Sequence, residues 1–192
     1  MTDVTIFGTG AMGTAIAGVL TQGGATVTHI GSDETTATVS GDVVVLAVPH
    51  SAVEAIVAGY GDQLAGKTVV DITNPLDFAT FDSLVVPADG SKAAELAARL
   101  PSSTVLKAFN TTFAATLTGG RVGDAGPTTV LVAGDDTAAK QGLIDLVTAG
   151  GLAAVDAGSL KRARELEALG FLQLTLAVGE KIGWTGGFAL IR

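Results

Sequence analysis

The sequence predicts an α/β fold of the Rossmann type, with a doubly wound, mostly parallel sheet and a short C-terminal helical segment. Two observations support this prediction. Short β-branched runs alternate with alanine-rich stretches along almost all of the 192 residues, and a glycine-rich turn joins the first predicted strand to the first predicted helix. A chain of this length fits one domain. We therefore expect a single dinucleotide-binding domain over residues 1–192.

The first strand and helix enclose the most informative motif of the chain. An apolar run at residues 3–7 leads directly into Gly8, Thr9, Gly10, Ala11, Met12 and Gly13, and a helix is expected over residues 11–22. In this type of turn, the first glycine permits the tight bend, the second lets the backbone approach a phosphate, and the third lets the helix pack close to the strand. Backbone N–H groups and the positive helix end then face a pyrophosphate. The motif therefore predicts dinucleotide binding.

The later strands are β-branched runs between turn residues, expected at residues 26–30, 43–48, 68–72, 104–108, 129–133 and 153–156. Alanine-rich stretches between them predict helices at residues 51–60, 92–100, 136–149 and 160–182, with a short irregular turn at residues 35–39. Residues 74–90 form one long irregular connection, and such connections are often functional. Because a doubly wound sheet binds ligands outside the carboxyl ends of its strands, motifs at those ends are the candidate site residues.

The C-terminal segment, residues 159–192, is expected to be a helix and tail that pack on the sheet or on a second subunit. Five charged residues predict a solvated start for the helix: Lys161, Arg162, Arg164, Glu165 and Glu167. Residues 168–178 are apolar nearly all round, which predicts burial on every side. A homodimer through this helix is therefore one expectation, and packing within one subunit is the other.

Composition excludes several classes of function. The chain has no cysteine and only two histidines, which excludes disulfides, thiolate nucleophiles and Cys-ligated metals, and we expect no metal site. A net charge of −8 disfavours nucleic acid and anionic membrane surfaces as partners. No export signal or run long enough to span a bilayer is present, so a soluble, cytoplasmic protein is expected.

Five segments occur in the same order as in a known family. They are residues 8–13, Ala47-Val48-Pro49, residues 71–76 with Asn74-Pro75, Lys107-Ala108-Phe109-Asn110-Thr111 and residues 156–158. With them the chain resembles the deazaflavin (coenzyme F420)-dependent NADP oxidoreductases, and in particular small bacterial members described only as dinucleotide-binding oxidoreductases. Similar segments occur in the cytosolic NADPH domain of six-transmembrane ferric reductases. The resemblance implies a Rossmann domain that binds NADP(H) and exchanges hydride with a flavin-like acceptor.

The resemblance also implies positions for the cofactor. The pyrophosphate would lie on residues 9–13 and the adenosine ribose near Gly31 and Ser32. Three residues would line the cofactor after the third strand: Val48, Pro49 and His50. Asn74, Ala108 and Asn110 would lie beside the nicotinamide, on the floor of the acceptor site.

Each of the less specific candidates also has a purely structural interpretation. His50 follows a proline at a helix start and is then simply solvated, Asn74 before a proline is a natural turn residue, and Asn110 caps the following segment. Lys107, a cation among apolar residues, favours a structural ion pair over catalysis. Trp184, between glycines, suits a packing anchor better than a stacking partner for a flat acceptor.

The nucleotide preference is less clear than the family implies. NADP sites usually place a Ser and an Arg just after the second strand, but here the residues are Gly31-Ser32-Asp33-Glu34, and the first basic residue of the chain is Lys67. Asp33 lies near the position of an NAD-type acid. NADP stays the preferred cofactor and NAD the alternative. A 2′-phosphate would then depend on backbone amides and on His29, Ser32, Thr35 and Thr36.

The sequence offers no convincing histidine–carboxylate pair for proton abstraction, so we assign no catalytic residue. Hydride exchange between a nicotinamide and a flavin-like ring needs none, because the protein chiefly holds the two rings face to face. Two alternatives stay open: a ferric or flavin reductase that uses NAD(P)H, and a non-catalytic NADP(H) sensor. The sequence does not identify the acceptor.

Overall fold

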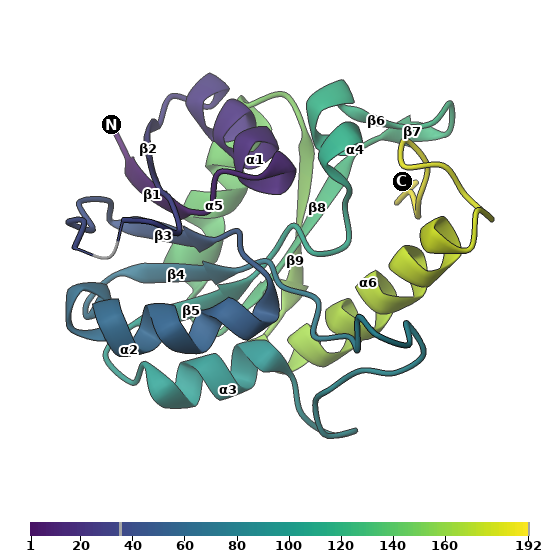
Figure 1. The fold of residues 1–192 in the computed structure, drawn as a ribbon. Coiled ribbons are helices and arrows are strands. Elements are labelled where there is room, and N and C mark those ends of the chain that lie inside the picture. Colours follow the sequence, from purple (N-terminus) through teal and green to yellow (C-terminus); the bar gives the residue numbers. More distant parts are fainter. Residues whose placement is uncertain (35, 192) are drawn as a thin grey trace.

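The computed structural model describes residues 1–34 and 36–191 and shows a sheet between two layers of helices (Figure 1). The strands of this sheet are β1 (Asp3–Phe7), β2 (Thr26–Ile30), β3 (Val43–Leu46), β4 (Thr68–Asp71), β5 (Thr104–Lys107), β8 (Thr129–Gly134) and β9 (Ala153–Gly158). Their order across the sheet is β2-β1-β3-β4-β5-β8-β9. Every strand expected from the sequence is present, and the ends differ by no more than two residues.

The sheet is parallel except at one junction. β1 to β5 pair in parallel, as do β8 and β9, whereas β5 and β8 are antiparallel. Between β5 and β8 the chain forms α4 (Ala114–Gly119) and a hairpin of β6 (Arg121–Val122) and β7 (Gly126–Pro127), after which it enters the sheet in the opposite direction. The predicted Rossmann-like, mostly parallel sheet is therefore confirmed.

Helices cover both faces of the sheet. α1 (Ala11–Gln22), α4 and α5 (Thr137–Ala149) pack on one face, and α2 (Val53–Leu64) and α3 (Lys92–Arg99) pack on the other (Figure 1). Alternate strand residues supply the two cores, with Ile6 on the α1 side and Phe7 on the α2 side. Burial on both faces is why these strands are apolar at nearly every position.

The register of the parallel strands aligns their carboxyl ends. Ile30 pairs with Phe7, Phe7 with Leu46, Leu46 with Asp71, and Asp71 with Lys107. The segments that follow these five residues therefore leave the sheet side by side. This register brings motifs from five separate parts of the sequence to one edge.

The structure corrects several predicted boundaries. A 3-10 turn (His50–Ala52) precedes α2, which continues to Leu64, where the leucine side chain is buried in the core. The predicted C-terminal helix begins with a 3-10 turn (Leu160–Arg162), continues as α6 (Ala163–Val178) and ends four residues early at Gly179. The structure also contains α4 and the hairpin after it, which were not predicted. The threonine-rich α4 has a low helix propensity, and its packing on α1 stabilises it. Thr35, in the predicted irregular turn, lies outside the described residues.

The C-terminal tail turns back from α6 toward the β6–β7 hairpin (Figure 1), where the Gly123 amide donates a 2.8 Å hydrogen bond to the Thr185 carbonyl. Within the described part of the chain, no helix has both the length and the apolar character that crossing a membrane would require.

Candidate functional site

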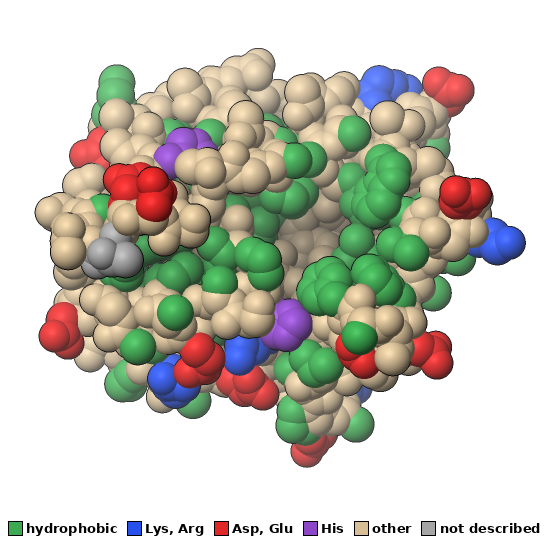
Figure 2. All heavy atoms as spheres, viewed as in Figure 1, with side chains coloured by type: hydrophobic (Ala, Val, Ile, Leu, Met, Phe, Trp, Pro, Cys, Tyr) green, Lys and Arg blue, Asp and Glu red, His purple; other side chains and the backbone are tan. Residues whose placement is uncertain are grey.

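The candidate site lies at the carboxyl ends of the parallel strands. The chain changes direction across the sheet between β1 and β3, which is the switch point where doubly wound folds bind ligands. Figure 2 shows the molecule hollowed on this side, with hydrophobic side chains along much of the hollow. Two adjoining cavities, defined below by their lining residues, occupy this region.

The glycine turn after β1 has the geometry that its sequence predicts. Gly8 has a φ of 112°, and a Cβ there would lie 2.2 Å from the carbonyl oxygen of Ala47; a Cβ at Gly13 would lie 2.5 Å from the Gly8 oxygen. These two glycines are therefore required by the fold itself. A Cβ at Gly10, in contrast, would meet no atom within 4 Å. The space at Gly10 is thus free for a ligand.

The first turn of α1 offers unused hydrogen-bond donors. Gly10 is the N-cap, no side chain caps this end, and the turn contains no acidic residue. The leading amides of a helix have no partner inside the helix, and they lie at its positive end. Thr9, Ala11 and Met12 therefore belong to a backbone surface suited to an anion.

A cavity of about 500 Å³ extends from this turn toward β2 and α2. Six predicted site residues line it, namely Gly8, Thr9, Gly10, Ser32, Val48 and Pro49. The lining also includes Ile56 and Tyr60 of α2 and Glu34, which the sequence did not identify as site residues. Apolar residues at helical spacing in α2 were the only signal for the first two.

A second cavity, of about 400 Å³, lies on the other side of the turn. Four predicted site residues line it, namely Ala11, Met12, Asn74 and Asn110, together with Phe113 and Trp184. None of its described lining residues is ionisable. The structure thus brings together residues from β1–α1, β4, β5 and the C-terminal tail around one largely apolar pocket.

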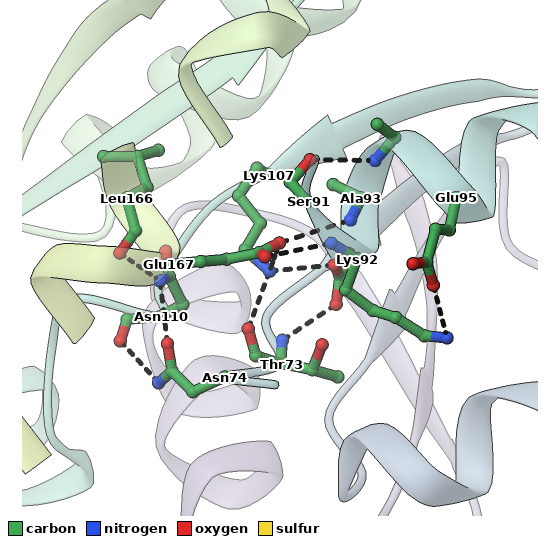
Figure 3. Close-up of polar contacts among 12 residues, drawn as sticks. Thr73, Asn74, Ser91, Lys92, Ala93, Glu95, Lys107, Asn110, Leu166 and Glu167 are labelled. Atoms are coloured by element: carbon green, nitrogen blue, oxygen red, sulfur yellow. Dashed lines mark hydrogen bonds and ion pairs between the residues drawn. The ribbon is translucent and has the colours of Figure 1, made fainter. Parts of the chain in front are cut away.

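Asn74 and Asn110 are held as a pair at the base of this pocket (Figure 3). Asn110 Nδ2 donates to Asn74 Oδ1 at 2.9 Å and to the Leu166 carbonyl at 2.7 Å, and Asn74 Nδ2 donates to the Asn110 carbonyl at 2.9 Å. Asn110 Oδ1 is buried and has no hydrogen-bond partner among the described residues. Helix α6 lies so close that a Cβ at Gly170 would be 2.3 Å from Asn74 Oδ1.

Three predicted site residues line neither cavity: Gly13, Ala108 and His50. Gly13 instead packs against the Gly8 carbonyl inside the turn. Ala108 is fully buried in the α1-side core, and its carbonyl accepts a 2.8 Å hydrogen bond from the Asn110 amide. It lies below the site because the next residue, Phe109, has a φ of 62° and turns the chain sharply. His50 is outside the lining of both cavities, and its ring stacks on Phe78 with 6.0 Å between ring centroids.

Lys107 lies in a fully buried cluster of charges behind the asparagine pair (Figure 3). Its Nζ is 2.8 Å from Asp71 Oδ2, 2.9 Å from Glu167 Oε1 and 2.6 Å from the Thr73 carbonyl. Cross-strand register explains the first contact, since Asp71 and Lys107 are direct neighbours. The predicted structural ion pair is therefore confirmed.

Glu167 corrects the prediction of a fully solvated start for the last helix, because its side chain is completely buried. It accepts hydrogen bonds from the Lys92 amide at 2.9 Å and the Ala93 amide at 3.2 Å, at the N-terminus of α3. Burial raises the pKa of Glu167, while Lys107 and the amide hydrogen bonds act in the opposite direction. Glu167 therefore ties α6 to both α3 and β5, a role that sequence spacing did not indicate.

Trp184 combines the two interpretations that the sequence allowed. Its ring packs edge-on against Phe113, with 5.0 Å between centroids, as a packing anchor would. It is also 52% exposed and lines the 400 Å³ cavity. Its position above that pocket leaves part of the indole available to a ligand.

Comparisons with known proteins agree with this geometry. A family model described as coenzyme F420-dependent NADP oxidoreductase matches residues 25–75. The F420-dependent NADP reductase of Methanocaldococcus jannaschii is 33% identical over 172 residues, covering 88% of this chain and 76% of that protein.

A solved structure from Arthrobacter sp. FB24, proposed to be an F420-dependent NADP reductase, superposes with a TM-score of 0.86 at 25% identity, and the match covers 100% of both chains. The metalloreductase STEAP3 of Rattus norvegicus is 39% identical over 108 residues. That match covers 56% of this chain and 21% of the metalloreductase.

Proposed function

The chain belongs to the coenzyme F420-dependent NADP oxidoreductase family, and on this premise we propose that it transfers a hydride between NADP(H) and a flat, flavin-like acceptor, either a deazaflavin or a flavin. One observation supports this most directly. The cavity of about 500 Å³ and the cavity of about 400 Å³ meet at a single glycine turn, with Gly10 lining the first and Ala11 the second. A dinucleotide in the first cavity would therefore present its nicotinamide to an acceptor in the second.

We assign the nucleotide to named parts of the first cavity. The amides of residues 9–13 bind the pyrophosphate, Ser32 lies at the ribose, and Val48 and Pro49 pack against the adenosine half. His50 and Ala108 act indirectly, His50 through the start of α2 and Ala108 through the turn that places Asn110. NAD stays an alternative cofactor.

The asparagine pair suits the nicotinamide end. Asn74 and Asn110 line the second cavity, and the hydrogen bonds that join them to each other and to the Leu166 carbonyl fix the direction of both amides. A fixed pair of side-chain amides beside the glycine turn therefore suits the polar carboxamide of the nicotinamide ring.

The lining of the second cavity fits hydride transfer without acid–base catalysis. When bound, the dihydronicotinamide supplies the hydride and the acceptor ring takes it up. The protein holds the rings, excludes water with Phe113 and Trp184, and places no ionisable side chain among the described residues that line this pocket. We therefore assign no catalytic residue.

Anaerobic mixing tests the proposal. NADPH is combined with the protein and, separately, with coenzyme F420, FMN, FAD or a ferric chelate, and loss of the reduced nicotinamide is followed by absorbance. We expect acceptor-dependent loss with the deazaflavin or a flavin, and none with Gly10→Val. Nucleotide binding without transfer to any acceptor would contradict the proposal and indicate a nucleotide sensor.

A ferric reductase is the second candidate, because the STEAP3 match covers more than half of this chain. The same assay separates the two functions. Loss of NADPH with the ferric chelate alone, and not with either type of ring, would favour it. Loss that needs a flavin in addition would indicate a flavin reductase that passes electrons on.

We also propose that α6 forms a homodimer. The face of α6 that carries Glu167 and Gln173 is buried on its own subunit, but Leu172 and Val178 are 49% and 45% exposed. The nearby tail adds exposed apolar side chains, including Phe188 and Ile191. Several exposed large apolar side chains on one segment are typical of an interaction surface.

Sedimentation analysis of the wild type and Leu172→Glu tests the dimer. A dimer that dissociates in the variant supports the proposal, and a monomeric wild type overturns it.

The absence of cysteine is consistent with a reducing cytoplasm, which we propose as the location.

A further inference from the structure

The loop after β2 places a carboxylate at the mouth of the nucleotide cavity. Glu34 lines the cavity of about 500 Å³, and its Oε1 accepts a 2.8 Å hydrogen bond from the amide of Gly31. The Gly31 carbonyl in turn accepts from the Glu34 amide at 3.2 Å, and Tyr60 donates its hydroxyl to the Glu34 carbonyl. The backbone of Glu34 is thus held from both sides. Its carboxylate accepts the hydrogen bond of the Gly31 amide, the first backbone N–H after β2.

A second carboxylate lies at the same point. A Cβ on Gly31 would be 2.8 Å from Asp33 Oδ1 and 3.4 Å from Glu34 Oε1, so both acids stand over this residue. Figure 2 shows acidic side chains on the side of the molecule where Figure 1 has the loop after β2. The rim of the cavity is therefore acidic where the adenosine ribose is expected.

No cation balances these acids among the described lining residues, which include neither Lys nor Arg. Lys67, the first basic residue of the chain, donates to the Gly41 carbonyl at 2.8 Å, before β3 and at the amino-terminal edge of the sheet. His29 is the nearest titratable group on β2, and its Nδ1 is held at 2.9 Å by the Gly8 carbonyl. A 2′-phosphate would meet two negative charges without a guanidinium or ammonium.

A ribose with free hydroxyls would meet a suitable partner instead. The 2′- and 3′-hydroxyls of NADH donate hydrogen bonds, and a carboxylate just after the second strand is the group that accepts them in NAD-binding Rossmann folds. A phosphate brings a charge of nearly −2 and only acceptor oxygens, so like charges face each other. The same side chain therefore favours one nucleotide and disfavours the other.

We propose that Glu34 determines the nucleotide specificity of this site. Because of its carboxylate, this member of an NADP reductase family also uses NADH and binds it at least as tightly as NADPH. This inference rests on the proposed function, since it assumes that a dinucleotide occupies the cavity. NADPH binds only after the Glu34 carboxylate has left the Gly31 amide, which then donates to the 2′-phosphate together with Ser32. NADH binds with the carboxylate near its observed position.

Calorimetric titration of the full chain with NADH, NADPH, ADP and 2′,5′-ADP tests this inference. We expect wild-type protein to bind NADH at least as tightly as NADPH, and ADP at least as tightly as 2′,5′-ADP. Glu34→Gln keeps the shape but removes the charge. It should shift the NADPH-to-NADH affinity ratio toward NADPH by about tenfold, the effect of one like charge removed from a partly exposed site.

Asp145→Asn is the matched control, because it removes one negative charge from an exposed position on α5 that does not line the cavity. It should leave the ratio within about twofold, since solvent and salt screen an exposed charge that does not line the cavity. Glu34 is exposed, and the thermal unfolding of Glu34→Gln should match the wild type. Asp33→Asn is a second variant with the same expected direction.

A wild type that binds NADPH more tightly than NADH would overturn the inference and leave the proposed function intact. An unchanged ratio in both Glu34→Gln and Asp33→Asn would also overturn it. Absence of binding of either dinucleotide would overturn the proposed function, and this inference with it.

Discussion

Replacing Lys107 by methionine tests whether the buried charge cluster stabilises the fold. The substitution keeps the length of the side chain but leaves Asp71 and Glu167, both fully buried, without their shared cation. Breaking a buried ion pair by removing one partner costs about 3–5 kcal/mol. For a chain of this size, each kcal/mol corresponds to about 2–4 °C, so we expect Tm to fall by roughly 6–20 °C.

The amides of α3 limit this cost but do not remove it. The Lys92 and Ala93 amides continue to donate to Glu167, whereas Asp71 keeps only the 2.8 Å hydrogen bond from the Thr73 amide. The two carboxylates then repel each other in a buried site. Protonation relieves this repulsion, so the loss of stability should shrink as the pH falls.

Urea unfolding of four proteins measures the effect: the wild type, Lys107→Met, Glu167→Gln and the double variant. Because Glu167→Gln removes one of the two uncompensated charges, the double variant should be more stable than the sum of the single losses predicts. Lys161→Met, at an exposed position, controls for the loss of one positive charge and should change little. At urea concentrations below its unfolding transition, Lys107→Met should transfer hydride at a rate within about tenfold of the wild-type rate, as expected if Lys107 has a structural role.

Two results would refute this reasoning. A loss of less than about 1 kcal/mol in Lys107→Met would mean that the cluster adds little to stability. A collapse of turnover in the folded variant would show that Lys107 takes part in the reaction.

The remaining predictions concern the glycines and the buried acid. Gly10→Val should stay folded, because its Cβ has open space, with only a small loss of Tm from the poorer N-cap, but it should abolish NADPH binding in calorimetry. Gly8→Ala, with a φ of 112° and a carbonyl oxygen 2.2 Å from its Cβ, should unfold at clearly lower urea concentrations. Gly170→Ala should displace Asn74 and cost about 1–3 kcal/mol of stability, with lower turnover in the acceptor assay; wild-type values would contradict the tight packing of α6. Burial raises the pKa of Glu167 above its ordinary 4.5, so the free energy of unfolding should decrease as the pH rises from 4.5 through that pKa. Glu167→Gln should flatten this part of the plot of unfolding free energy against pH, measured with urea. A plot that runs parallel to that of the wild type would contradict the prediction.

Much of the fold was predictable because its signals are local. The β-branched runs identified every strand of the sheet within two residues, and the bounds of α1 matched the predicted helix. The short α4 and the β6–β7 hairpin were missed because their formation depends on packing against α1 and on the returning tail rather than on periodicity. The end of α6 was overestimated because the predicted helix was extended to residue 182, past the apolar stretch that ends at Val178 and past the Gly179 C-cap.

The site was predictable in part. Residues 8–13 form a self-contained motif whose geometry follows from glycine stereochemistry, and the family resemblance pointed to Asn74 and Asn110. The resemblance also included His50 and Ala108, which the fold places outside the two cavities. Position in a motif does not show the direction of a side chain, because a single residue such as Phe109, with its positive φ, turns the chain.

The sequence by itself determined the fold class, the nucleotide-binding turn and the acidic character of the segment after β2, since each depends on neighbouring residues. Only the tertiary structure decided which distant residues meet. It buried Glu167 against Lys107, packed Gly170 on Asn74, and folded the Glu34 carboxylate onto the Gly31 amide. The physical reason is that burial and electrostatic pairing depend on distances in space. Those distances are set only when the sheet register and the packing of α6 bring separate segments to one edge.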